Sequence, residues 1–159
     1  MSTPVRVATW RTTAVHHLGL TVADLDRSIR FYRDVLGMPF LGRRQADADY
    51  VARQTGFAGV RLDVASFRLA PDSDQMLQLA QYLNHAGTPS DQSSNRSGNT
   101  HLCLVVDDIH AAHEDLSVKG VKFKSAPVEI TAGPHRGGFG VYLFDPDGFT
   151  IELHQRPPA

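Results

Sequence analysis

The stretch HLGLTVADLDRSIRFYRDVLGMPF begins at His17, and a similar stretch, HLCLVVDDIHAAHEDLSVKGVKF, begins at His101. The two align at an offset of 84 residues, with a slip of one residue near their ends. A second correspondence follows at an offset of 74 residues, where the triplet around Gln78 (LQL) matches the triplet around Glu152 (IEL). An internal repeat of this kind indicates a duplicated structural unit, so it decides the architecture before any other feature.

The first copy opens with the pattern of a strand followed by a helix. Apolar and polar residues alternate over residues 15–22, which is typical of a half-buried strand, and His17 lies on the face opposite the leucines. Asp24 suits the N-cap of a helix whose apolar residues recur at helical spacing as far as Leu36. Gly37 suits the C-terminal end of that helix.

The remaining segments repeat in the same order in both copies. In the first copy they are a strand beginning at 38–44, a long polar connection at 47–59, and strands at 60–69 and 75–82. In the second copy they are a strand at 101–106, a helix at 108–119 that ends at Gly120, an extended stretch at 121–130, a glycine-rich loop at 131–138, and strands at 140–147 and 149–155. The sequence therefore predicts an α+β protein made of two tandem βαβββ modules, with antiparallel pairing inside each module.

The boundaries of these modules follow from composition. An N-terminal arm at 1–14 precedes the first module at 15–83, and a polar linker at 84–98 contains almost nothing that could pack in a core. The second module spans 99–155, and a short tail occupies 156–159. The linker either covers a site or only connects the modules, which together form one domain.

Composition excludes several classes of protein. The chain has 159 residues, 42% of them hydrophobic, and a formal net charge of -1, which predicts a globular domain and no surface for nucleic acid. Cys103 is the only cysteine, so no internal disulfide can form, which fits a reducing compartment. Neither a signal-peptide core nor an apolar run of about 20 residues is present, so we expect no membrane association and a cytoplasmic location.

Four polar residues stand where strands are otherwise apolar. They are His17 and Gln78 in the first copy and His101 and Glu152 in the second. Two imidazoles, a carboxylate and an amide oxygen suit a divalent transition metal, and a buried carboxylate is costly unless it is paired or metal-bound. In the alternative interpretation the histidines are ordinary strand-end residues and Glu152 faces solvent. Recurrence in both copies favours the metal site.

The chain resembles the vicinal oxygen chelate superfamily, which includes glyoxalase I, methylmalonyl-CoA epimerase, extradiol dioxygenases and bleomycin-resistance proteins. The motifs are HLGLTVADLDRSIRFYRDVLGM near the start and VYLFDPDGFTIEL near the end, and the resemblance covers residues 15–155. It implies a glyoxalase-like fold, in which the two modules form an open barrel-like sheet around a central metal. It places the metal ligands at His17, Gln78, His101 and Glu152, and it implies a homodimer that acts on a small molecule.

The resemblance leaves the chemistry open between three functions. The first is proton transfer next to a carbonyl, as in an epimerase or isomerase or a glyoxalase I-like lyase, with one divalent ion (Zn, Ni, Co, Mn or Fe(II)) and Glu152 as the base. Gln78 stands where glyoxalase I usually has a second glutamate, and an amide cannot act as a base. Asp47 or Asp49 is a weaker choice for a second base.

The second function is Fe(II)-dependent extradiol ring cleavage, for which His17, His101 and Glu152 would form the metal triad. Tyr142 and His135, in a stretch similar to the dioxygenase signature, would then act as acid/base or substrate-orienting groups. The third function is sequestration of a small molecule without catalysis. Among other residues, we expect Cys103 to be buried as a small hydrophobe, His154 to share the face of Glu152, and His16 to lie on the surface.

Overall fold

The computed structural model describes residues 10–158. Most of the predicted arm at 1–14, and the last residue of the predicted tail at 156–159, lie outside the described residues. The first half contains β1 (His17–Thr21), α1 (Leu25–Arg30), a π-helical continuation η1 (Phe31–Val35), β2 (Phe40–Ala46), α2 (Asp49–Thr55), β3 (Leu62–Arg68) and β4 (Met76–Tyr82). The second half contains β5 (His101–Val105), α3 (Ile109–Val118), β6 (Lys122–Phe123), β7 (Val128–Glu129), β8 (Phe139–Phe144) and β9 (Thr150–Gln155).

The strands form two sheets that repeat one topology. The first sheet has the order β1-β4-β3-β2 and the second has the order β5-β9-β8-β6, with β7 also paired to β8. In both sheets the first strand is parallel to the last, and the other pairs are antiparallel. The predicted antiparallel pairing inside each module is therefore found in every pair except β1 with β4 and β5 with β9, for which the prediction is wrong. The helix after each first strand returns the chain to the end where that strand began, which makes a parallel pair possible.

The ends of the repeated helices are as the sequence predicts. The carboxylate of Asp24 accepts a hydrogen bond from the backbone N–H of Arg27, and the carboxylate of Asp108 accepts two at the start of α3. Gly37 and Gly120, with φ angles of 70° and 81°, adopt the left-handed conformation after these helices.

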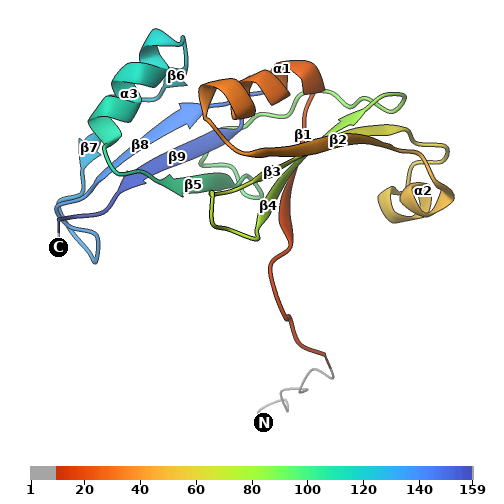
Figure 1. Cartoon of the computed structure of the whole chain (residues 1–159), viewed down its shortest axis with the longest axis horizontal. Coiled ribbons are helices and arrows are strands. Elements are labelled where there is room, and N and C mark those ends of the chain that lie inside the picture. The colour runs from red at the N-terminus through yellow and green to blue at the C-terminus, as the bar shows by residue number, and fades with distance from the viewer. Residues whose placement is uncertain (1–9, 159) are drawn as a thin grey trace.

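The predicted polar connection at 47–59 contains a helix, α2. Only Val51 is buried on that helix, so its seven residues carry too few apolar positions for a helical period to appear in the sequence. Its C-terminal cap is Gly56, which has a positive φ of 79°. In Figure 1 α2 stands at the outer end of the first sheet, away from the second sheet.

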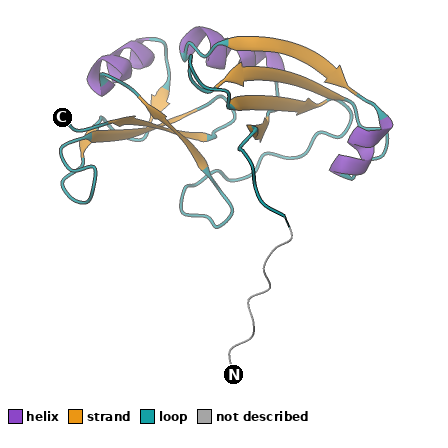
Figure 2. Ribbon diagram, turned by 60° about the horizontal axis from the view of Figure 1, so that its bottom comes forward, coloured by secondary structure: helices purple, strands orange, loops and turns teal. Residues whose placement is uncertain are grey.

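The apolar core lies between the sheets and the helices that cover one side of them. Figures 1 and 2 show α1 and α3 on the same side of the two sheets. Leu77 and Leu79, on either side of Gln78, and Ile151 and Leu153, on either side of Glu152, are buried in one core cluster that includes residues of both modules. Because strand side chains alternate between faces, the residues between these leucines and isoleucine belong to the opposite face.

Two polar contacts fasten the modules to each other. The hydroxyl of Tyr32 donates a hydrogen bond of 3.0 Å to the carboxylate of Asp145, in the turn between β8 and β9, and both side chains are buried. Burial raises the pKa of Asp145, and the Tyr32 hydroxyl acts in the opposite direction. Arg27 pairs with Asp147 in the same turn. Since Tyr32 and Arg27 come from the first module, the helix of one module is bound to the turn of the other.

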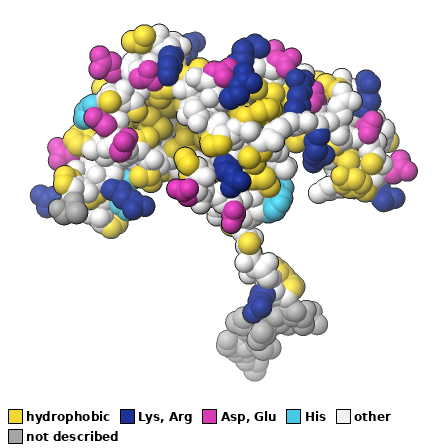
Figure 3. Space-filling model, viewed as in Figure 1, with side chains coloured by type: hydrophobic (Ala, Val, Ile, Leu, Met, Phe, Trp, Pro, Cys, Tyr) yellow, Lys and Arg dark blue, Asp and Glu magenta, His cyan; other side chains and the backbone are white. Residues whose placement is uncertain are grey.

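The surface agrees with the small net charge. On the face shown in Figure 3, basic and acidic side chains of the described residues are interspersed over the helices and strands. Within residues 10–158, no helix is long and apolar enough to cross a membrane.

Candidate metal centre

The predicted metal ligands share the sheet faces that turn away from the helices. In β1 and in β5, burial alternates so that the leucines are half-buried, while His17 and His101 are exposed. In β4 and β9, Gln78 and Glu152 are half-buried and lie between fully buried neighbours. This open side of the sheets is where the two pairs of polar residues gather.

In the second module, His101 and Glu152 are in direct contact. The Nε2 atom of His101 lies 3.0 Å from an Oε atom of Glu152, and the side chains are 44% and 22% exposed. β5 runs parallel to β9, and Cys103 is in register with Glu152. His101 stands two residues before Cys103 on the same face of β5, so its side chain lies beside that of Glu152. Imidazole nitrogen and carboxylate oxygen bind Zn²⁺ at about 2.1 Å, so two such ligands are about 3.4 Å apart at the tetrahedral angle and about 3 Å apart at a right angle. The observed separation is that of a hydrogen bond, and it is short enough for both atoms to bind one ion after a small shift.

Glu152 is flanked by two other ionisable side chains. Tyr142, on β8, is in register with Glu152, and its ring centroid lies 5.5 Å from that of His101. Burial and the nearby Glu152 carboxylate raise the pKa of Tyr142 above that of a free tyrosine. Partial desolvation of the sulfur, followed by the same carboxylate, raises the pKa of the Cys103 thiol. Cys103 is exposed, so its predicted burial is wrong: the alternation of β5 puts it on the open face with His101.

In the first module, His17 and Gln78 come from neighbouring parallel strands. Gly19 of β1 is in register with Gln78, and Ser66 of β3 is in register with it on the other side. His17 and Gly19 share one face of β1, which is also the face of Gln78. Because Gly19 has no side chain, the space beside Gln78 stays open on the side of His17.

His16 is exposed, as predicted, and it also contacts a predicted ligand. Its Nδ1 atom lies 2.8 Å from Nδ1 of His17, and the two rings meet edge to face with centroids 5.1 Å apart. The hydrogen bond uses the Nδ1 atom of His17 and leaves its Nε2 atom for another partner. The only signal in the sequence is the dipeptide His-His at the start of the strand.

Within one chain, the four predicted ligands lie as two separate pairs, one on each sheet. Among residues 10–158, no three side chains of the His, Cys, Asp and Glu types form a group that could hold a metal. His17 therefore does not join His101 and Glu152 in one chain. The two pairs belong to separate sheets, and each sheet presents its pair on the open side.

The remaining predicted site residues lie near the edges of this region. His135, in the glycine-rich loop, packs against His154 with ring centroids 5.0 Å apart, and His154 is two residues along β9 from Glu152. His154 is buried, and within the described residues its Nε2 atom has no hydrogen-bond partner. Asp47 and Asp49 are exposed at the start of α2, at the outer end of the first sheet (Figure 1).

Comparison with known proteins gives one answer for the family. Residues 14–153 match the profile of the Glyoxalase/Bleomycin resistance protein/Dioxygenase superfamily. A 2-epi-5-epi-valiolone epimerase from Actinomyces sp. is 32% identical over 91% of this chain and 80% of its own length. A lactoylglutathione lyase from Haemophilus influenzae is 33% identical over 86% of this chain and 88% of its own length.

Solved structures show the same fold. A glyoxalase family protein from Bacillus cereus superposes with a TM-score of 0.81 at 19% identity, over 96% of this chain and 100% of that one. A glyoxalase/dioxygenase from Nostoc punctiforme has a TM-score of 0.66 at 27% identity, over 99% of this chain and 100% of that one. The α+β class expected from the repeat, and the glyoxalase-like fold implied by the family resemblance, are confirmed. The chain belongs to the glyoxalase/bleomycin resistance protein/dioxygenase superfamily.

Proposed function

We propose that this protein is a divalent-metal-dependent isomerase or lyase that transfers a proton next to a carbonyl group of a small oxygenated substrate. The observation that carries the proposal is the His101–Glu152 pair, whose donor atoms are 3.0 Å apart on an open sheet face. Both donor atoms are close enough to bind one metal after a small shift, and the carboxylate is also a base that can accept a proton.

The metal site requires ligands from both sheets. His101 and Glu152 would supply two of them, and His17 and Gln78 would supply the others. A Zn, Ni, Co, Mn or Fe(II) ion bound there supplies Lewis-acid stabilisation of negative charge that develops on a substrate oxygen. The His17 and His101 imidazoles are both exposed, so both are accessible to such an ion.

A second copy of the chain would complete each site. Among residues 10–158 of one chain the two proposed ligand pairs form no single metal-binding group, and alternate residues of β1 and β5, including His17 and His101, are exposed. If two copies face each other about a twofold axis, the first sheet of one copy meets the second sheet of the other, and two equivalent sites form. We therefore propose a homodimer as the active form.

Within the site, Glu152 is the group that moves the proton. Gln78 occupies the corresponding position in the first module and cannot accept a proton, so only one side of the pseudo-twofold carries a base. Tyr142 stands beside Glu152, and its raised pKa keeps the hydroxyl protonated at neutral pH. That hydroxyl can donate a hydrogen bond to a substrate oxygen as negative charge develops on it.

The relatives support this class of reaction. One is named as an epimerase and several are named as lactoylglutathione lyases, at identities near 30%. An epimerase inverts a carbon centre, and for a centre next to a carbonyl this is done by removing and returning a proton. Proton transfer is common to both kinds of relative and supports the proposed reaction. Because the relatives are named for different substrates, the names do not identify the substrate of this protein.

Solvent deuterium exchange tests the proposal. The purified protein is stripped with a chelator, reloaded with each divalent metal, and incubated in D2O with small α-hydroxyketones. We expect exchange at the carbon next to the carbonyl only in the metal-loaded protein, and its loss in the Glu152→Gln variant. A protein that binds no metal stoichiometrically would contradict the proposal and favour sequestration of a small molecule.

Ring cleavage is a second candidate because of one contact. Tyr142 packs edge to face against His101, so an acid/base group lies beside a predicted iron ligand. The expected result for this function is oxygen consumption with catechols in the Fe(II)-loaded protein. Exchange without oxygen consumption would reject it.

A further inference from the structure

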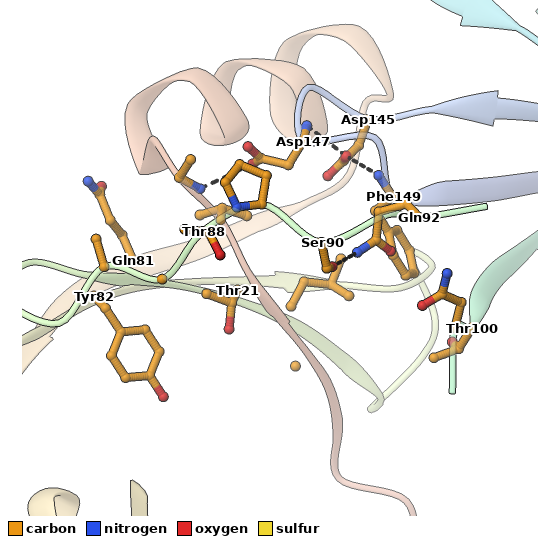
Figure 4. A pocket seen from close by; sticks show the side chains of 18 of the residues that line it. Thr21, Gln81, Tyr82, Thr88, Ser90, Gln92, Thr100, Asp145, Asp147 and Phe149 are labelled. Carbon is orange, nitrogen blue, oxygen red and sulfur yellow. Dashed lines mark hydrogen bonds between the residues drawn. The ribbon is translucent and has the colours of Figure 1, made fainter. Parts of the chain in front are cut away.

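A pocket of about 620 Å³ lies between the modules, under the segment that joins them. We call residues 83–100, between β4 and β5, the linker loop. The pocket is formed by the end of β1, the end of β4, the turn between β8 and β9, and the linker loop. Figure 4 shows its side chains spread along the cavity from Tyr82 at one end to Thr100 at the other. This volume is within the range of about 300–1,000 Å³ that small-molecule sites occupy.

The pocket wall includes direct neighbours of two proposed metal ligands, Gln78 and His101. Gly19 lines it, shares the face of His17 and is in register with Gln78. Thr100, which also lines it, directly precedes His101 in the chain. None of the four proposed ligands lines the pocket, but its wall continues into the strands β1 and β4 and reaches the start of β5.

The linker loop is tied to the sheet that carries Glu152. The Nζ atom of Lys124 donates a hydrogen bond of 2.7 Å to the hydroxyl of Ser94, and the same ammonium lies 5.5 Å from the ring centroid of Tyr142. Lys124 follows β6, which pairs with β8. The loop thus has a fixed contact near the catalytic side of the second module.

The chemistry of the pocket is that of neutral hydroxyl and amide groups. The polar side chains that line it, apart from two aspartates, include Thr21, Tyr82, Thr88, Ser90, Gln92 and Thr100. Among the described residues that line it, none is Lys, Arg or His. Hydroxyls and amides both donate and accept hydrogen bonds, so they match the hydroxyl groups of a polyol.

The two aspartates of the pocket are already paired. Asp145 accepts hydrogen bonds from the Tyr32 hydroxyl and from the backbone N–H groups of Asp147 and Phe149. Asp147 is paired with Arg27. A phosphate or carboxylate in this pocket would meet the Asp145 carboxyl group, which has no cationic partner among residues 10–158, and no Lys, Arg or His among the lining residues, and burying an unpaired anion is costly.

We propose that the linker pocket binds the neutral, polyhydroxylated part of the substrate, such as the ring of a cyclitol or sugar ketone. The identification of its occupant as the substrate rests on the proposed function, whereas the binding itself requires no metal. The pocket then selects against anionic substrates such as thiol conjugates of glutathione.

The test compares a neutral probe with an anionic probe on metal-free, full-length protein. Isothermal titration calorimetry measures the Kd of an inosose (a hydroxylated cyclohexanone) and that of glutathione. We expect the inosose to bind at least tenfold more tightly. Tyr82→Phe and Thr88→Val each remove one hydroxyl and should weaken inosose binding about fivefold. Ser97→Ala, in the linker loop but outside the pocket, is the matched control and should leave the Kd unchanged.

Other outcomes overturn the assignment. Tighter binding of glutathione, no binding of the inosose, or equal Kd values in the wild type and both pocket variants would each contradict it. The two proposals fail separately. Inosose binding without deuterium exchange would reject the reaction alone, whereas exchange on an anionic ketone without inosose binding would reject the pocket assignment alone.

Discussion

The two modules place different neighbours around equivalent positions. Gln78 has Gly19 and Ser66 in register on its two sides, whereas Glu152 has Cys103 and Tyr142. No neighbour of Gln78 in this set has an ionisable side chain, and both neighbours of Glu152 do. The duplicated fold thus repeats the four predicted ligand positions, while the carboxylate and its ionisable in-register neighbours occur in one copy.

This difference separates two roles that a symmetric site would share between its halves. In a site with two carboxylates, either face of a substrate can lose its proton to a base. Here the half with His17 and Gln78 would bind and orient, and the half with His101 and Glu152 would react. The following predictions test that division, from the largest expected effect to the smallest.

Glu152→Gln makes the two halves alike and removes the base. We expect the rate of deuterium exchange to fall by about 10²–10⁴-fold, because that is the usual contribution of a positioned general base. The fold should persist, since Glu152 is half-buried and the core residues beside it are unchanged. Far-ultraviolet circular dichroism checks the fold, and an exchange rate within a factor of two of wild type would remove Glu152 from the mechanism.

Gln78→Glu places a carboxylate in both halves of the site. A second carboxylate should keep the metal and supply a base on the other face of the substrate. We expect the exchange rate or its stereochemical course to change by about tenfold or more. NMR of the deuterated product measures both, and Ser66→Ala, next to Gln78 on β3, is the control. If metal binding and turnover are both unmoved, Gln78 is not in the site.

His16→Ala tests whether a residue beside the metal site positions a ligand. His16 bonds to the Nδ1 atom of His17 and would fix the orientation of that ring. Loss of such a partner typically lowers metal affinity by about tenfold or more. Competition with a coloured chelator measures the affinity, and His110→Ala, on the first turn of α3, is the control. Equal affinities in wild type and His16→Ala would show that the contact is incidental.

Tyr32→Phe tests the contact that holds the modules in their relative positions. The lost hydrogen bond to buried Asp145 should lower the free energy of unfolding by about 1–3 kcal/mol at pH 7, measured by urea denaturation. The hydroxyl favours the ionised carboxylate and so lowers the pKa of Asp145, which burial raises. The loss should therefore shrink as the pH falls through the folded-state pKa of Asp145. A loss that is independent of pH would show that the bond contributes little to ionisation.

The sequence predicts the repeated elements and their caps well because each rests on local chemistry. The repeated helices begin after Asp24 and Asp108 and end before Gly37 and Gly120. These boundaries depend on contacts within a few residues, so they can be predicted from the local sequence. The family motifs likewise identify the fold. The ligand assignment carried by those motifs stays a prediction.

The features that the sequence did not reveal depend on packing between distant segments. The parallel direction of β1 and β4 is set by how the chain crosses back over the sheet. The short helix α2 has one buried residue, so its sequence shows no helical period of apolar residues. Tyr32 and Arg27 join the turn of the second module, 113 and 120 residues away, and no local pattern in the sequence indicates these contacts.

The linker loop places recognition and reaction on different parts of the chain. The proposed catalytic side chains stand on strands whose register is fixed by the hydrogen-bond ladders of the sheets. Much of the pocket wall belongs to a loop outside those ladders. Substitutions in the loop can alter which molecule is held without shifting the atoms that react with it. The fold is therefore open to changes of substrate by mutation at a few loop positions, at little cost to its chemistry or its folding.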